Sequence, residues 1–244
     1  MKLSEVKALV TGGSSGIGLA TARAIRQAGG KVVVAGRDPD RLEEAIQVTG
    51  GFGVRADVRQ APDVERMFNV ARERLDGLNV LVNNAGYGYV APLLEIDPAQ
   101  FEAVWRTNVL GAMLCAQAAA KVFVEQERGT IINVGSTSAL RGSASASPYS
   151  ATKFALRGMT ESWRRELRDK NVRVMLVNPS EVMTEFASHR VDAAGDTHAK
   201  TYSEAERHTK LRGDEIAQTI VSLLALDDRA LVTEAEVWAV NPVR

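Results

Sequence analysis

Short runs of apolar, mostly β-branched residues recur along the chain, and a longer stretch with helical spacing of its apolar positions follows most of them. Runs that are apolar throughout predict strands buried on both faces. We expect seven strands, within residues 6–12, 31–36, 52–58, 79–86, 130–136, 172–179 and 235–240. Strands of this kind that alternate with helices form a parallel sheet covered by helices on both faces. The pattern therefore predicts an α/β fold with one parallel sheet between two layers of helices.

Three of the intervening stretches begin with residues typical of a helix start. Asp38, Asp97 and Ser147 each stand directly before a proline. A side-chain oxygen of Asp or Ser caps the first backbone N–H groups of a helix, and proline suits its first position. We therefore expect all three residues to be N-caps.

One stretch, residues 184–212, is polar and has no clear period. It contains all three histidines, His189, His198 and His208, whose spacing matches no metal site. We expect them to be solvated residues of a loop or surface helix, and we predict no metal. The stretch is interpreted as a lid on the substrate side.

Length and charge narrow the function classes. The chain has 244 residues, enough for one α/β domain over 1–244 with an ample core. Lys+Arg and Asp+Glu are equal at 30 each, so no excess positive charge is available for nucleic acid. Nucleic acid is therefore not an expected partner.

The sequence also bears on the compartment. Cys115 is the only cysteine, which excludes an internal disulfide and fits a reducing compartment. The first residues lack the apolar core of a secretory signal. The longest apolar region, 109–124, is interrupted by Gln117 and Lys121 and is too short to span a bilayer. We expect a soluble, cytoplasmic protein with no membrane partner.

The glycine-rich turn TGGSSGIG, residues 11–18, follows the first strand and opens the first helix. Backbone N–H groups at a helix N-terminus lack partners inside the helix, and the helix dipole adds positive charge there, so a pyrophosphate fits. The alternative is a tight strand-to-helix turn that binds no ligand.

Further motifs decide between these alternatives. The glycine turn, NNAG at 83–86, Asn108, Ser136 in NVGSTS and YSATK at 149–153 have the order and spacing of the short-chain dehydrogenase/reductase family. The chain resembles this family, in its 3-oxoacyl reductase-like form, over essentially its whole length. The resemblance implies an α/β, doubly wound Rossmann fold with strand order 3-2-1-4-5-6-7 and a site at the carboxyl ends of the strands. It also implies an NAD(P)-dependent oxidoreductase that acts on a small carbonyl or alcohol.

Four residues are the expected catalytic group. Tyr149 and Lys153 are four apart on a predicted helix, so they share one face, and the cation favours the tyrosine phenolate. The resemblance implies that Tyr149 is the general acid/base, that Lys153 hydrogen-bonds the nicotinamide ribose and that Ser136 orients the substrate oxygen. It implies that Asn108 holds a water of the proton relay. A buried amide with only a structural role is the alternative for Asn108.

The resemblance also implies a set of coenzyme contacts on the turns that follow the strands. Asp57 has a competing interpretation as a loop cap. The expected contacts are Gly12, Ser14, Ser15, Gly16, Ile17, Gly18, Arg37, Asp57, Val58, Asn84, Ala85, Gly86, Tyr149, Lys153, Pro179, Val182 and Thr184.

The end of the second predicted strand bears on the choice of coenzyme. An acidic residue about 20 positions beyond the glycines binds the ribose 2′-OH of NAD, whereas an arginine accommodates the 2′-phosphate of NADP. Gly36 stands where NAD-type members carry the acid, and Arg37 follows it. We therefore predict NADP(H), with NAD(H) as the alternative.

Two segments depart from the family pattern. Ser180 replaces the glycine of the usual Pro-Gly-x-x-x-Thr motif, although Pro179 and Thr184 match. The chain ends in TEAEVWAVNPVR where many members have an Asp-Gly-Gly segment.

The helices near 98–127 and 148–168 are rich in small and apolar residues, and in the family such helices pair across a twofold axis. We therefore predict a homodimer or homotetramer, with burial inside the monomer as the alternative for about half of these side chains. The residues concerned are Ala116, Ala119, Phe123, Phe154, Leu156, Met159 and Trp163.

Several functions remain open at this point. 3-Oxoacyl thioesters, small ketones, sugars and pteridine-like carbonyls all suit such a scaffold. A coenzyme-binding regulatory or scaffold protein without turnover is the second hypothesis. The presence of Asn108, Ser136, Tyr149 and Lys153 argues against it, since such a protein need not retain all four.

Overall fold

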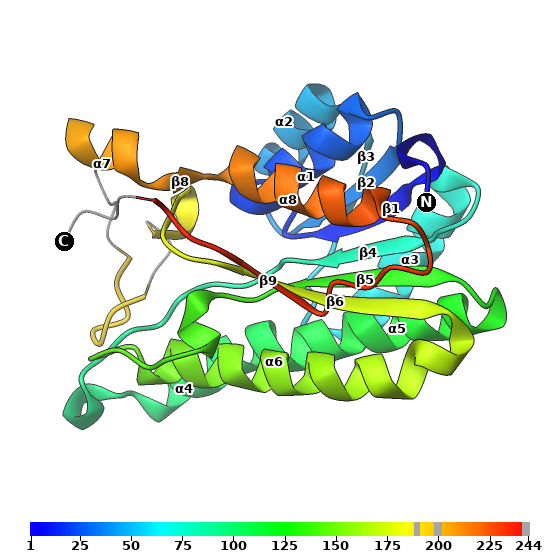
Figure 1. Ribbon diagram of the computed structural model, residues 1–244. Coiled ribbons are helices and arrows are strands. Elements are labelled where there is room, and N and C mark those ends of the chain that lie inside the picture. The colour runs from blue at the N-terminus through cyan, green and yellow to red at the C-terminus, as the bar shows by residue number, and fades with distance from the viewer. Residues whose placement is uncertain (188–190, 198–201, 241–244) are drawn as a thin grey trace.

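A seven-stranded parallel sheet forms the centre of the molecule (Figure 1). The computed structural model describes residues 1–187, 191–197 and 202–240. The strand order is β3-β2-β1-β4-β5-β6-β9. The strands are β1 (Lys7–Thr11), β2 (Lys31–Gly36), β3 (Phe52–Arg55), β4 (Val80–Asn83), β5 (Gly129–Val134), β6 (Val172–Pro179) and β9 (Glu234–Val237). This confirms the predicted doubly wound fold and its strand order.

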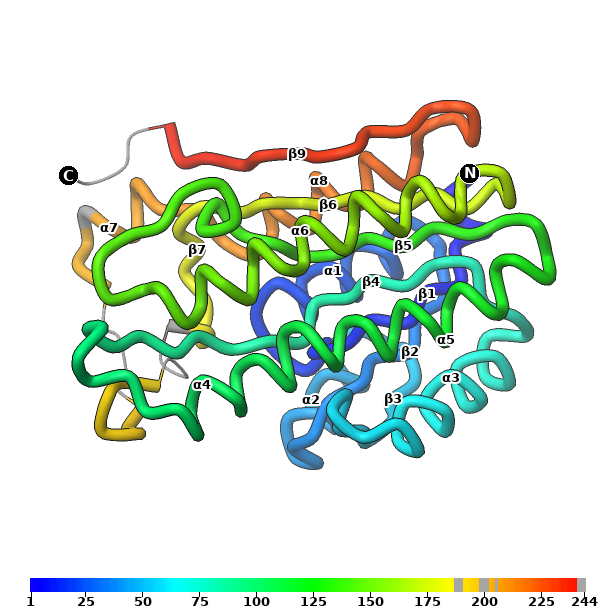
Figure 2. The backbone as a smooth tube through the Cα atoms, turned by 90° about the horizontal axis from the view of Figure 1, so that it is seen from below, coloured from blue at the N-terminus to red at the C-terminus, as the bar shows by residue number. Residues whose placement is uncertain are grey.

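Helices cover both faces of the sheet, because successive side chains of each strand point to opposite faces. Ala8 and Val10 of β1 belong to the hydrophobic cluster under α1 (Gly16–Gln27), α2 (Pro39–Thr49) and α8 (Gly213–Ala225). Leu9 belongs to the cluster on the other face. That face carries α3 (Ala61–Leu75), α5 (Ala112–Glu125) and α6 (Ser147–Leu167), which lie in front of the sheet in Figure 2.

One long helical segment runs through Pro98–Glu125. It consists of α4 (Pro98–Trp105), a π-helical turn (Arg106–Gly111) and α5. With 28 residues the segment is long and apolar enough to cross a membrane. The prediction that the longest apolar region covers only 109–124 and is too short to span a bilayer was therefore wrong. Half of its most apolar window is buried, and Cys115, Ala119 and Phe123 pack in the core against the sheet. Core packing therefore accounts for its hydropathy.

The predicted helix starts are correct at two of three positions. The Asp38 carboxylate accepts hydrogen bonds from the backbone N–H groups of Asp40 and Arg41, at 3.0 and 3.2 Å. Asp97 caps α4 through the Ala99 N–H. The prediction for Ser147 was wrong, because α6 begins at this residue and Ala146, which has no capping side chain, precedes it.

Part of the stretch 184–212 is regular. β7 (Val182–Met183) pairs with β8 (Leu211–Arg212) in a second small sheet, and α7 (Glu204–Thr209) precedes β8. His208 lies in α7, whereas His189 and His198 are outside the described residues. Among the described residues there is no group of three or more side chains that could hold a metal ion.

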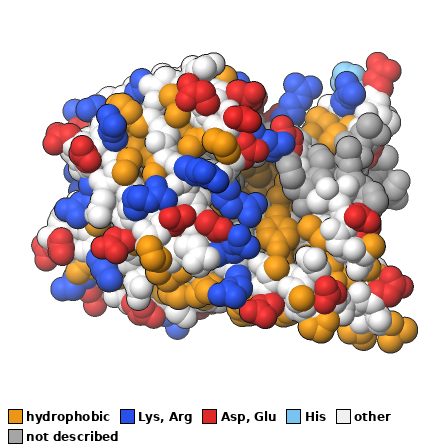
Figure 3. All heavy atoms as spheres, turned by 180° about the vertical axis from the view of Figure 1, so that it is seen from behind, with side chains coloured by type: hydrophobic (Ala, Val, Ile, Leu, Met, Phe, Trp, Pro, Cys, Tyr) orange, Lys and Arg blue, Asp and Glu red, His pale blue; other side chains and the backbone are white. Residues whose placement is uncertain are grey.

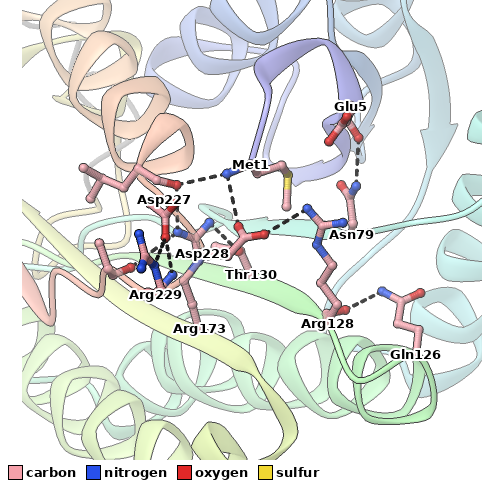
Figure 4. A network of polar contacts seen from close by, with 12 residues as sticks. Met1, Glu5, Asn79, Gln126, Arg128, Thr130, Arg173, Asp227, Asp228 and Arg229 are labelled. Carbon is pink, nitrogen blue, oxygen red and sulfur yellow. Dashed lines mark hydrogen bonds and ion pairs between the residues drawn. The ribbon is translucent and has the colours of Figure 1, made fainter.

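A network of polar side chains lies at the amino-terminal ends of β5 and β6 (Figure 4). The buried Arg173 guanidinium donates to Thr130 Oγ1 at 3.1 and 3.2 Å and to the Leu226 carbonyl at 3.4 Å. Arg128 forms an ion pair with Asp228 at 3.0 Å. These contacts tie α8 and the segment before β9 to the sheet, at the end opposite the cleft described below.

Candidate active site

A cleft of about 1010 Å³ opens at the carboxyl ends of the strands. Residues that follow β1, β2, β4, β5 and β6 line it, together with residues of α6 and of the segment after β6. Figure 3 shows the molecule hollowed, with apolar side chains inside the hollow and basic side chains near one side of it. In a doubly wound sheet this edge is where ligands bind.

The glycine turn forms one wall of the cleft. Gly12 and Gly16 have φ angles of +61° and +53°, which side chains rarely adopt. A Cβ at Gly12 would lie 2.9 Å from the Cα of Ala85. Asn84 Nδ2 donates to the carbonyls of Thr11 and Gly12, at 3.0 and 3.1 Å. The glycine turn therefore packs closely against Asn84 and Ala85, which follow β4.

The first backbone N–H groups of α1 receive no hydrogen bond from a capping side chain. Ser15 occupies the N-cap position, but its side chain makes no capping hydrogen bond. The first N–H groups of a helix have no partner within the helix, so they suit an anion. Gly18, also predicted to touch the coenzyme, does not line the cleft. A Cβ there would lie 2.3 Å from the Gly12 carbonyl oxygen, so its role is close packing under the turn.

Tyr149 and Lys153 lie one turn apart on α6, as predicted, and both line the cleft. The Lys153 Nζ is 5.6 Å from the centre of the Tyr149 ring and donates to the Val134 carbonyl at 3.0 Å. Burial lowers the pKa of Lys153 to about 8. A partly exposed Phe186 ring packs against the Tyr149 ring at 5.7 Å between centres.

Ser136 follows β5 and reaches the same part of the cleft. Its backbone N–H donates to Asn178 Oδ1 at 3.1 Å, and its Oγ accepts a hydrogen bond from the Ser138 N–H at 3.1 Å. Because the hydroxyl oxygen accepts from the backbone, its proton is left to donate to another group. The structure thus brings Ser136, Tyr149 and Lys153 together.

Asn108 lies behind this group, in the π-helical turn, and does not line the cleft. Its Oδ1 accepts from the Tyr87 N–H at 3.0 Å, and its Nδ2 donates to the Tyr87 carbonyl at 2.9 Å and to Thr152 Oγ1 at 3.1 Å. Both amide protons are therefore used. These contacts match the structural alternative for the side chain, and the water relay stays a prediction. Single π-turns are frequent at functional sites.

Asp57 lines the cleft beside Arg59. The carboxylate accepts from the Arg59 Nε and Nη2, at 2.9 and 2.5 Å, and from the Arg59 N–H at 3.0 Å. Burial opposes ionisation of Asp57, but the hydrogen bonds from Arg59 outweigh it, so the pKa of Asp57 lies below its usual value. Asp57 is thus a loop cap as well as part of the cleft wall.

The remaining predicted contacts come from several strand ends. Ser14, Ile17, Arg37, Val58, Gly86, Pro179, Val182 and Thr184 all line the cleft. Ser180, which departs from the family pattern, donates its N–H to the Val237 carbonyl at 2.9 Å. Its Oγ accepts from the Ala239 N–H at 3.3 Å, so this position ties the segment after β6 to β9.

Residues 6–194 match the family described as short chain dehydrogenase. The chain belongs to this family. It is 29% identical over 238 residues to oxidoreductase asL5 of Sarocladium schorii, covering 97% of this chain and 94% of that protein. As a member of the short-chain dehydrogenases, the protein is an NAD(P)-dependent dehydrogenase or reductase that acts on small molecules.

Solved structures of this family are similar over nearly the whole chain. A variant of actinorhodin polyketide ketoreductase with NADPH has a TM-score of 0.86 and 28% identity, covering 98% of this chain and 97% of that one. An alcohol dehydrogenase from Thermococcus sibiricus complexed with 5-hydroxy-NADP has a TM-score of 0.82 and 29% identity, covering 97% and 98%.

The sequence motifs missed several residues of the cleft wall. They lie in loops or on a helix face outside the family motifs, where neither periodicity nor spacing distinguishes them. These residues are Tyr87, Arg59, Gln100, Phe186, Tyr202 and Lys210. Three of them, Phe186, Tyr202 and Lys210, lie in 184–212, so the sequence predicted their segment as a substrate-side lid without singling them out.

Proposed function

We propose that the protein is an NADP(H)-dependent oxidoreductase that reduces a carbonyl to an alcohol, or catalyses the reverse reaction, with Tyr149 as the general acid/base. The observation that carries the proposal is the convergence of Ser136, Tyr149 and Lys153 in one cleft with the uncapped start of α1. A ketone, aldehyde or 3-oxoacyl thioester is the proposed substrate class.

The cleft fits a nicotinamide dinucleotide. The glycine turn, where a Cβ at Gly12 would meet Ala85, and the helix start at Ser15 suit a pyrophosphate. Arg37 lines the cleft, and within the described residues its guanidinium makes no hydrogen bond or salt bridge. An unpaired arginine at this point suits the 2′-phosphate of NADP. The two solved relatives that hold NADPH and 5-hydroxy-NADP support the same preference.

The chain's own groups supply the proton chemistry. The bound nicotinamide would donate or accept the hydride. Ser136 donates a hydrogen bond from its hydroxyl to the substrate oxygen and so orients that oxygen beside Tyr149. In reduction Tyr149 donates its phenolic proton to that oxygen, and in oxidation it removes the proton from the alcohol. The protonated Lys153, held by the Val134 carbonyl, stabilises the phenolate left on Tyr149.

We further propose a homodimer or homotetramer in the cytoplasm. Phe154 on α6 is 45% exposed, which suits a contact between copies of the chain. Four of the residues considered for this contact, Ala116, Ala119, Phe123 and Leu156, are buried inside the monomer and cannot contribute to it. The proposed contact therefore rests on Phe154 and the partly buried Met159 and Trp163.

The test is absorbance-monitored oxidation of NADPH and of NADH with a panel of 3-oxoacyl thioesters, diketones and simple aldehydes. Tyr149→Phe is expected to lower kcat by about 10²–10⁴-fold while NADPH still binds, because only the proton transfer is removed. Retention of turnover in this variant would refute the assigned role of Tyr149. Binding of NADPH without turnover of any substrate by the wild type would favour the scaffold alternative.

A further inference from the structure

The loop that carries Ser136 rests on a side chain of the neighbouring strand. Asn178, in β6, is fully buried, and its Oδ1 accepts the hydrogen bond from the Ser136 N–H. The side chain can approach this N–H because residue 135 is glycine. A Cβ at Gly135 would lie 2.1 Å from Asn178 Oδ1. The Asn178 amide therefore fixes the backbone from which the Ser136 hydroxyl projects.

Glu234, the first residue of β9, determines which way the Asn178 amide faces. Its Oε1 accepts a hydrogen bond from Asn178 Nδ2 at 2.5 Å. A carboxylate accepts hydrogen bonds and donates none, so the amide nitrogen faces Glu234 and the amide oxygen faces Ser136. Arg157 of α6 holds the other carboxylate oxygen of Glu234, at 3.1 and 3.2 Å. A continuous chain of hydrogen bonds thus runs from α6 to the Ser136 loop.

We propose that Glu234, acting through Asn178, is a positioning residue for Ser136. The inference rests on the proposed function, in which the Ser136 hydroxyl orients the substrate oxygen. Without the Glu234 carboxylate, the Asn178 side-chain amide can rotate by half a turn. Its nitrogen would then face the Ser136 N–H, and two hydrogen-bond donors would oppose each other. The loop then shifts to relieve this contact. A small misplacement of a group that orients the substrate lowers kcat without weakening coenzyme binding.

Variants of two glutamates on β9 provide the first experiment. Glu234→Ala is expected to lower kcat about tenfold, with the Kd for NADPH unchanged. Glu234→Gln keeps an acceptor oxygen and is expected to regain most of this loss. Glu236→Ala is the matched control, because Glu236 lies on the same strand but accepts from Trp238 Nε1 at 3.0 Å. This control is expected to keep the wild-type kcat, and an equal loss in both alanine variants would overturn the proposal.

The Ser136→Ala background distinguishes positioning from general support of the fold. If Glu234 acts through the Ser136 hydroxyl, Glu234→Ala causes no further loss of kcat once that hydroxyl is absent. Residual turnover of the Ser136→Ala protein is measured at high enzyme concentration. A role confined to holding the fold together would lower kcat by the same factor in both backgrounds, and this result would overturn the proposal.

Hydrogen exchange of the Ser136 amide, followed by NMR, needs no turnover. We expect faster exchange in Glu234→Ala and wild-type exchange in Glu236→Ala, because only the first change releases the Asn178 amide. Unchanged exchange in Glu234→Ala would refute the link to Ser136. Absence of turnover in the wild type would instead refute the proposed function, and the exchange measurement would still decide whether Glu234 holds the loop.

Discussion

Gly36 at the end of β2 lies directly against Ser14 of the glycine turn. A Cβ at Gly36 would lie 2.8 Å from Ser14 Oγ and 3.2 Å from Ser14 Cβ. An acidic side chain at this position, which would bind the ribose 2′-OH of NAD, would therefore require the Ser14 side chain to rotate or shift. The next residue, Arg37, lines the cleft instead.

Arg37→Ala is expected to weaken NADPH binding. A hydrogen bond to a charged group contributes about 1.5–3 kcal/mol, so the Kd for NADPH should rise roughly tenfold to a hundredfold. The Kd for NADH should change little, because NADH has no 2′-phosphate. Fluorescence titration of the protein with each coenzyme tests this. Arg23→Ala is the control, because Arg23 forms an ion pair with Asp214 and does not line the cleft. Equal losses for both coenzymes would contradict the role of Arg37.

The buried Lys153 makes stability depend on pH in a predictable direction. Its pKa is about 8 in the folded protein and 10.5 when exposed. Between these values the unfolded chain binds a proton that the folded protein has released, so stability rises with pH. Below about 8 both states are protonated, and the contribution is constant at its lowest level. The burial cost of the ammonium is therefore greatest under the conditions in which Lys153 supports the phenolate of Tyr149.

Comparison with Lys153→Met isolates this effect. The free energy of unfolding of the wild type minus that of the variant is expected to be flat from pH 6.5 to 8. It should then rise by up to about 3 kcal/mol toward pH 10.5. Urea unfolding at a series of pH values measures the difference, with Tyr149→Phe in both proteins because the loss of Lys153 would also change the titration of Tyr149. A difference that stays constant or falls above pH 8 would show that Lys153 is not buried as a cation.

The sequence predicts the strands well, and it also predicts that Tyr149 and Lys153 share one face of a helix, because each of these depends on a local pattern. The apolar run around Val10 and the spacing of Tyr149 and Lys153 are visible in the sequence itself. The contacts behind the proposed catalytic group are not visible there, because they join distant segments. Asn178 and Glu234 are 56 positions apart and meet only because β9 pairs with β6. No periodicity in the sequence carries that information.

Local rules also fail where a neighbouring segment decides the outcome. Ser147 before Pro148 has the features of an N-cap, yet α6 starts one residue too early for its side chain to cap the helix. The long helix Pro98–Glu125 continues through a π-turn that brings Asn108 onto the backbone of Tyr87. The pairing of β7 with β8 joins two pairs of residues that are too short to stand out as strands.

Phe186 covers the ring of Tyr149, and this contact can be tested without turnover. The two rings are 5.7 Å apart at an angle of 57°, a tilted aromatic pair. Such pairs contribute about 0.5–1.5 kcal/mol, so Phe186→Ala should expose the Tyr149 ring and raise its nitration by tetranitromethane roughly twofold to tenfold. Peptide mapping follows each tyrosine, with the fully buried Tyr89 as the internal control. Unchanged nitration of Tyr149, or an equal rise at Tyr89, would contradict a shielding role for Phe186.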